Sequence, residues 1–173
     1  RDAKAAGAPV KLLCDRKGEF QSQGNRPGYI ADIRAAATAD GKVTAFDIKN
    51  HGANNGGCAV PYVYHIGASR VNQRDVRLNA GGPPAFRAPG QPEACFLAEA
   101  VVDALACKVG LDPLEFRRKD CAGDAKRLRQ MDMGATAMEW DRKFQKQPGS
   151  MPGPKKRGVG LALRREGAHV TIS

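Results

Sequence analysis

The sequence predicts an α+β fold in which antiparallel hairpins are followed by a buried helix pair. Residues 29–38 alternate apolar and polar side chains with the two-residue period of a half-buried strand. Asp40-Gly41 then supplies a tight turn before a second strand, residues 43–48. An apolar run without a strand period, residues 92–109, predicts a long helix, and a further helix start follows it at residue 112 or 113.

The chain before the helices reads as short elements joined by polar connections. Residues 1–8 have the composition of a helix end, and the apolar residues 10–14 predict a short strand. Residues 15–23 form a polar connection with room for one helical turn. Further extended runs are expected at residues 62–66 and 69–78, with loop chemistry in residues 50–57 between the hairpin and these runs.

The two central helices carry signals at their ends. Gly110 is a natural stop for the first helix. Residues 112–115 have the capping-box pattern of a helix start, and Leu111 and Phe116 stand at the positions of a hydrophobic staple. The second helix is therefore expected to end near residue 120.

The remainder predicts weaker helices, a linker and one more hairpin. Residues 124–131 and 135–144 are compatible with helix, and strands are expected over residues 159–163 and 168–172. We therefore predict that residues 1–146 belong to one domain, that the Pro- and Gly-rich residues 147–158 are a linker, and that residues 159–173 begin the next domain. The start at Arg1 and the strand-like end suggest a fragment of a longer chain.

Composition restricts the classes of function. The chain is 42% apolar and 27% charged, which is typical of globular proteins, and no apolar run approaches the roughly 20 residues that span a membrane. The formal charge of +10 and the pI near 9.7 suggest a nucleic-acid partner. However, the basic residues are spread along the chain and only 6% of residues are aromatic, which disfavours nucleic acid. A small basic module that binds nucleic acid or an acidic protein remains the alternative function.

No residue set predicts a catalytic or metal site. The five cysteines include no closely spaced pair, so a zinc or redox motif is not supported, and scattered reduced thiols are typical of the cytoplasm. The three histidines, His51, His65 and His169, lie far apart and are expected at the surface or in packing. Glu99 and Asp103 share one helix face, and a buried basic partner is a better explanation for them than acid–base chemistry.

One loop is suited to a cofactor. Residues 85–93 are a Gly/Pro-rich stretch that runs directly into the long helix, and a helix N-terminus favours an anion or a polar cofactor. By itself this signal is weak, because many helices begin in this way, and the physics alone favours a purely structural role.

The same region carries a family resemblance. Phe86-Arg87-Ala88-Pro89-Gly90, the helix around Glu99 and Asp103, and residues 110–117 (Gly-Leu-Asp-Pro-Leu-Glu-Phe-Arg) resemble the molybdopterin-binding large subunits of the xanthine dehydrogenase, aldehyde oxidase and carbon monoxide dehydrogenase group. Residues 24–27, 40–45 and 74–76 fall in the expected order. The resemblance covers nearly the whole chain, is most specific over residues 84–120, and is thin over residues 121–155.

The resemblance implies a site made of Phe86, Arg87 and Ala88 beside the molybdenum cofactor, molybdopterin. Arg87 then makes a backbone contact near the cofactor, although its side chain could equally pair with a core carboxylate. Residues 1–146 would be part of the first molybdopterin-binding domain. Ala88 replaces the cysteine that carries copper in the carbon monoxide enzymes, which argues against that subtype, and Pro89 replaces an aromatic residue of the xanthine enzymes. An aldehyde or an N-heterocycle is thus the expected substrate.

The resemblance also implies what the chain lacks. The catalytic glutamate and the glycine-rich loop of the family lie outside it, so we assign no catalytic residue and expect the chain to be inactive alone. Its expected partners are the rest of the large subunit, an iron–sulfur subunit or domain, and a small-molecule substrate, but no membrane. Iron–sulfur clusters, with flavin as a further option, would lie on other domains or subunits. The expected location is the cytoplasm, or the periplasm if a signal precedes Arg1.

Overall fold

The computed structural model describes residues 2–24, 26, 28–54, 63–84, 88–147, 149–164 and 167–172. Strands and helices occur in separate runs along the chain, which is typical of an α+β fold. In chain order the elements are α1 (Asp2–Ala6), α2 (Arg16–Ser22), β1 (Tyr29–Ala37), β2 (Val43–Ala53), β3 (Ala68–Val76), α3 (Gln91–Val109), α4 (Pro113–Asp120), α5 (Ala125–Met138), α6 (Trp140–Lys143), β4 (Val159–Arg164) and β5 (Gly167–Ile172).

The first sheet contains the predicted hairpin and one unexpected pairing. β1 and β2 pair antiparallel, with Ile33 opposite Ile48, and the turn between them uses Gly41 at a φ of 96°. β3 joins the other side of β2 in a parallel register, so the sheet is mixed, whereas the sequence predicted antiparallel hairpins and no partner for the strand over residues 69–78. A parallel neighbour needs a crossover connection, and residues 54–67 between β2 and β3 are long enough for one. β4 and β5 form the second antiparallel hairpin, as predicted.

The central helices begin and end close to the predicted residues. α3 ends at Gly110, which adopts a φ of 76°, and the Asp112 side chain caps α4 by accepting hydrogen bonds from the N–H groups of Leu114 (2.7 Å) and Glu115 (3.3 Å). The weaker helical signal after residue 124 becomes one long helix, α5. Glu139 interrupts it at a φ of 52°, and the short helix α6 follows.

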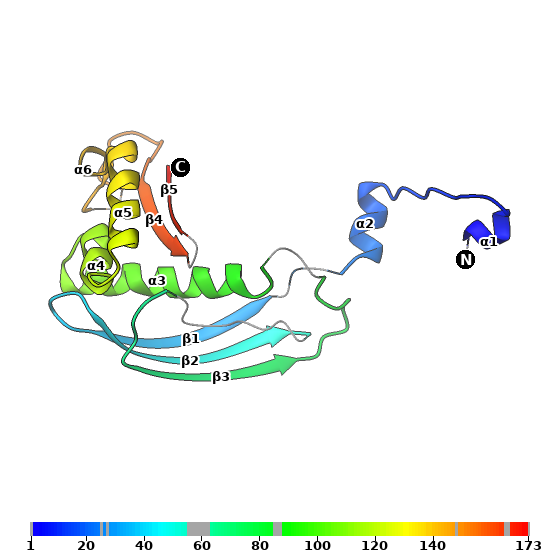
Figure 1. Ribbon diagram of the computed structural model, residues 1–173, viewed down its shortest axis with the longest axis horizontal. Helices are drawn as coiled ribbons and strands as arrows, with labels where there is room; N and C mark the ends of the chain where they lie inside the picture. The colour runs from blue at the N-terminus through cyan, green and yellow to red at the C-terminus, as the bar shows by residue number, and fades with distance from the viewer. Residues whose placement is uncertain are drawn as a thin grey trace.

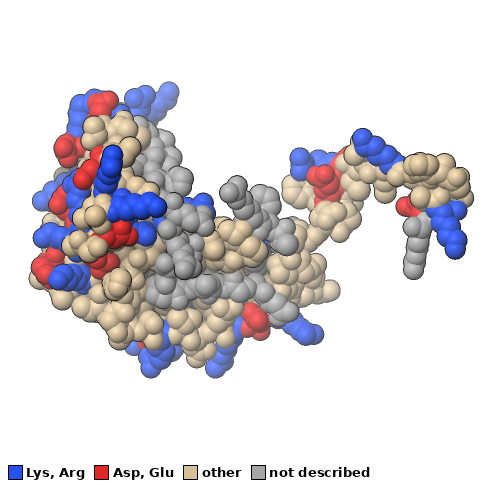
Figure 2. Space-filling view, in the orientation of Figure 1, with Lys and Arg blue, Asp and Glu red and all other residues tan. Residues whose placement is uncertain are grey.

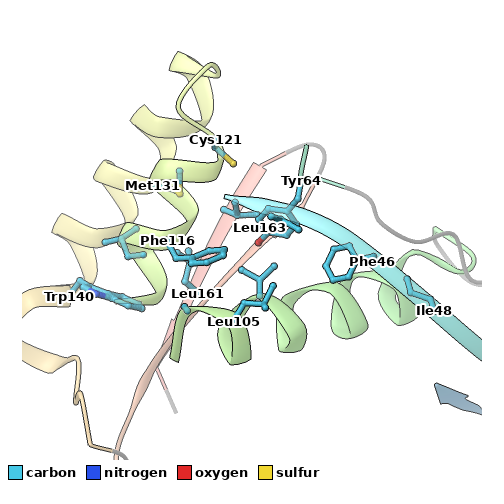
Figure 3. Packing of buried hydrophobic residues seen from close by; sticks show 14 residues of the cluster. Phe46, Ile48, Tyr64, Leu105, Phe116, Cys121, Met131, Trp140, Leu161 and Leu163 are labelled. Atoms are coloured by element: carbon cyan, nitrogen blue, oxygen red, sulfur yellow. The ribbon is translucent and has the colours of Figure 1, made fainter. Parts of the chain in front are cut away.

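Helix α3 lies between the two halves of the core. Figure 1 shows the three-stranded sheet on one side of α3, and α4, α5, α6 and the β4–β5 hairpin on the other. Phe46 and Ile48 of the sheet, and Phe116 and Leu163 of the other half, are buried in one continuous cluster (Figure 3). α3 is apolar nearly all round, so the core covers only part of its apolar surface. Its uncovered face is exposed to solvent: Phe96 is 72% exposed, and Ala100, Ala104 and Cys107 are exposed as well.

The N-terminal arm differs from the prediction. Residues 10–14 form no strand, and Leu12 and Leu13 are more than three-quarters exposed. Figure 1 shows α1 and α2 extending away from the sheet, so no described strand lies beside this segment to pair with it. Apolar residues alone cannot form a strand, because the backbone groups of a strand need a partner.

Asp120, the last residue of α4, gives a pH-dependent prediction. Its Oδ1 accepts a hydrogen bond from the Val43 N–H (2.8 Å), whereas its Oδ2 is buried with no hydrogen bond within the described chain. Burial raises the pKa of the Asp120 carboxyl, although the bond from Val43 opposes this shift. Ionised Asp120 therefore lowers stability above the raised pKa, and this cost disappears as the pH falls below 3.8, the ordinary value.

We therefore expect Asp120→Asn to have a higher free energy of unfolding than the wild type at neutral pH. This advantage should shrink as the pH is lowered. Urea unfolding between about pH 3 and pH 8 measures this difference. Asp124→Asn is the control, because its carboxyl accepts a hydrogen bond from the Arg127 N–H and its pKa is lowered, which reverses the sign. A difference that stays constant with pH for Asp120→Asn would contradict the prediction.

Candidate functional site

The predicted site residues stand immediately before α3. Phe86 and Arg87 lie outside the described residues, so their contacts stay predictions. Ala88 is described and has an unusual backbone, with a φ of 56°. Its carbonyl accepts a hydrogen bond from the Gln91 N–H (3.1 Å), and Gly90, the residue that caps α3, has a φ of 76°. The chain thus turns sharply through a left-handed conformation, rare for alanine, into the helix N-terminus.

Gly24 and Gly82 allow the segment that leads into this loop, residues 82–84, to pack against residue 24. A Cβ atom built on Gly24 would lie 2.0 Å from the carbonyl oxygen of Gly82 and 3.1 Å from the Cδ of Pro84. Only glycine permits so close an approach between two backbones. The segment that leads into the predicted site is therefore packed against residue 24.

Asn54 also holds this segment, through hydrogen bonds of its side chain. Its side-chain oxygen accepts a hydrogen bond from the Leu78 N–H (2.7 Å), and its amide nitrogen donates to the carbonyl oxygens of Ala80 (3.2 Å) and Gly81 (3.4 Å). The sequence showed only a turn-rich loop here. The available signal was an asparagine at a strand end, because asparagine tolerates the left-handed backbone that Asn54 adopts at a φ of 51°.

Two polar side chains, one on α3 and one on β2, have buried atoms without hydrogen bonds to the described residues. Glu93, in the first turn of α3, lies 3.7 Å from Arg26 through its Oε1, while its Oε2 is buried and has no hydrogen-bond partner in the part of the chain that is described. Asn50 is fully buried on β2, and neither its Nδ2 nor its Oδ1 has a partner there. Each such group carries a desolvation cost of about 1–3 kcal/mol, which a polar ligand or water would offset.

The carboxylates of α3 have the basic partner that the sequence predicted. Arg117 of α4 is fully buried and contacts Glu99 (2.7 Å) and Asp103 (2.7 Å). The Tyr64 hydroxyl donates to Glu99 (2.6 Å) and accepts from the Arg117 Nε–H (3.1 Å). This cluster is structural: it lies in the core and ties α4 and residue 64 to the middle of α3.

The described residues contain no group of three or more His, Cys, Asp or Glu side chains able to hold a metal ion. His51 and His65 are exposed, as expected. Within the described ranges, none of the helices has the length and apolar character needed to cross a membrane.

Comparison with known proteins confirms the family resemblance. Residues 2–121 match the family model described as "Molybdopterin cofactor-binding domain". A xanthine dehydrogenase molybdenum-binding subunit from Escherichia coli O157:H7 is 27% identical over an alignment 188 residues long, gaps included, and the alignment covers 92% of this chain. An aldehyde oxidoreductase from Megalodesulfovibrio gigas is 32% identical over 130 residues, which cover 68% of this chain.

The fold agrees as well. The crystal structure of the aldehyde oxidoreductase from Desulfovibrio desulfuricans superimposes on 93% of this chain with a TM-score of 0.75 and 26% identity. The chain spans 24% of the Escherichia coli relative, 14% of the Megalodesulfovibrio relative and 20% of the crystallised chain. It therefore corresponds to a portion of a larger molybdenum-binding subunit. The chain belongs to the molybdopterin cofactor-binding domain family of xanthine dehydrogenases and aldehyde oxidoreductases.

Proposed function

We propose that this chain supplies the cofactor-side loop of a molybdenum hydroxylase, with Phe86, Arg87 and Ala88 against molybdopterin. The observation that carries the proposal is the backbone at Ala88, whose φ of 56° and hydrogen bond to Gln91 set the loop at the N-terminus of α3. A non-glycine residue in this conformation is strained, and such strain is concentrated at ligand-binding sites.

The residues present fit this cofactor. The N-terminus of a long helix favours the negative charge of a pterin phosphate. The Oε2 of Glu93, in the same first turn, has no hydrogen bond to the described residues and supplies an acceptor for the amino groups of a pterin. When bound, the molybdenum centre would supply the oxidation chemistry, and the role of this chain is to position the cofactor.

The substrate and partners follow from the same proposal. We expect an aldehyde or an N-heterocycle as the substrate, with electrons leaving through iron–sulfur clusters on other domains or subunits. The open apolar face of α3 around Phe96 suits burial against the rest of the large subunit. Because no catalytic carboxylate can be assigned in the chain, we expect no turnover by the chain alone.

The test uses two substitutions at Ala88. Expressed in a host that makes molybdopterin, the wild-type chain should retain pterin, which can be measured by fluorescence after oxidation. Ala88→Val should retain at least about tenfold less, because a β-branched residue resists a positive φ, whereas Ala88→Gly should retain as much as the wild type. Equal retention by both variants, or oxidation of an aldehyde by the isolated chain with a dye acceptor, would refute the proposal.

A further inference from the structure

A basic hollow lies outside the region that the family model matches. It is formed by α6 and by residues 145, 150, 151, 157 and 158, beyond the matched residues 2–121. The hollow measures about 600 Å³, and Arg142, Lys143, Gln145, Ser150 and Arg157 are among its lining residues. This size falls within the range of small-molecule sites in proteins.

The charge of this region is strongly unbalanced. Residues 139–158 contain six basic side chains and only two acidic ones, Glu139 and Asp141. Glu139 forms ion pairs with both Arg142 and Lys143. Arg157 is exposed and lines the hollow, and no carboxylate among the described residues pairs with it. Figure 2 shows blue basic side chains interspersed with red acidic ones at the end of the molecule where Figure 1 places α5 and α6.

The walls of the hollow are attached to the core. Gln145 donates a hydrogen bond to the carbonyl oxygen of Arg157 (3.0 Å), and Ser150 donates to Gln145 (3.4 Å). The preceding aromatic pair, Trp140 and Phe144, is stacked at 5.2 Å, and the Trp140 Nε1–H donates to Asp112 (3.0 Å). The hydrogen bond between Gln145 and Arg157 thus joins the two segments that line the hollow. One segment carries Arg142 and Lys143, and the other carries Arg157.

We propose that this hollow binds a small phosphate-bearing anion. One arginine guanidinium can donate two parallel hydrogen bonds to a phosphate group, and Lys143 and Ser150 supply further donors in the hollow. Nucleic acid is disfavoured because Trp140, the aromatic residue best suited for stacking, is buried at 3% exposure. The site is separate from the proposed molybdopterin loop and does not depend on it.

Calorimetry with pyrophosphate tests the proposal on the full chain. We expect saturable binding that Arg157→Gln weakens at least about tenfold, because a bidentate contact is lost. Arg16→Gln is the matched control: it removes the same charge from α2, where Arg16 is 80% exposed, and should change the affinity by less than about twofold. Both side chains are exposed, so thermal unfolding should be unchanged in either variant.

Two results would overturn the proposal. Equal weakening by Arg157→Gln and Arg16→Gln, or no saturable binding, would show attraction to net charge only. Tighter binding of single-stranded nucleic acid than of pyrophosphate, with a steep dependence on salt, would identify the surface as a nucleic-acid site instead.

Discussion

Replacing Arg117 by alanine is expected to lower the free energy of unfolding by about 3–5 kcal/mol, the usual cost of leaving a buried charge without its partner. Arg117 has no exposed surface and donates hydrogen bonds to Glu99, Asp103, Tyr64 and the carbonyl oxygen of Pro113. Without it, the Glu99 carboxylate would keep one donor among the described residues, the Tyr64 hydroxyl, in a site that water barely reaches.

The electrostatics of the cluster support this direction. Burial alone would lower the pKa of Arg117, but the neighbouring Tyr64, Glu99 and Asp103 outweigh it and raise the pKa. Burial also raises the pKa of the Tyr64 hydroxyl, which therefore remains a proton donor to Glu99. Arg117 thus stays charged in the core, and its positive charge balances the carboxylates of α3.

Urea unfolding of Arg117→Ala and Arg118→Ala gives the comparison. Arg118 is the adjacent residue, is 31% exposed, and pairs with Glu115 and Asp132 at the surface, so its loss should cost less than about 1 kcal/mol. The double variant Arg117→Met with Glu99→Leu should recover much of the loss, because a well-packed apolar pair can replace a buried ion pair. Similar costs for the two alanine variants would refute a charge-balancing role for Arg117.

This cluster shows how far the sequence could predict the fold. Glu99 and Asp103 are four residues apart, so helical geometry places them together and requires a basic partner. The identity of that partner depends on the angle between α3 and α4, which the sequence does not specify. The direction of β3 escaped prediction for a similar reason, because a strand pattern is the same in parallel and antiparallel pairing.

The candidate site was predicted less completely. A Gly/Pro-rich loop before a helix is too common to identify a cofactor, and Phe86, Arg87 and Ala88 were assigned from the family resemblance. The contacts that support the approach to this loop, from Asn54 and Gly24, join segments about 25 to 60 residues apart. Local patterns cannot reveal contacts between such distant segments.

Gly24→Ala should displace the segment that leads into the proposed cofactor loop. The new Cβ would lie 2.0 Å from the Gly82 carbonyl oxygen, so one of two backbones must move. Overpacking of this kind typically costs about 1–3 kcal/mol. Because Pro84 lies next to the clash and directly precedes residues 85–88, we also expect pterin retention to fall at least about tenfold, as for Ala88→Val.

Gly82→Ala separates this effect from the general effect of adding a methyl group. A Cβ on Gly82 meets nothing within 4 Å, so this variant should be neutral or slightly stabilising and should retain pterin like the wild type. Both variants add one methyl group at the same backbone contact. Only the methyl group on residue 24 points into that contact. Loss of pterin in Gly24→Ala alone would show that the packing of residue 24 against residues 82–84 positions the cofactor loop. Equal behaviour of both variants would mean that the loop is held by other contacts, such as those of Asn54.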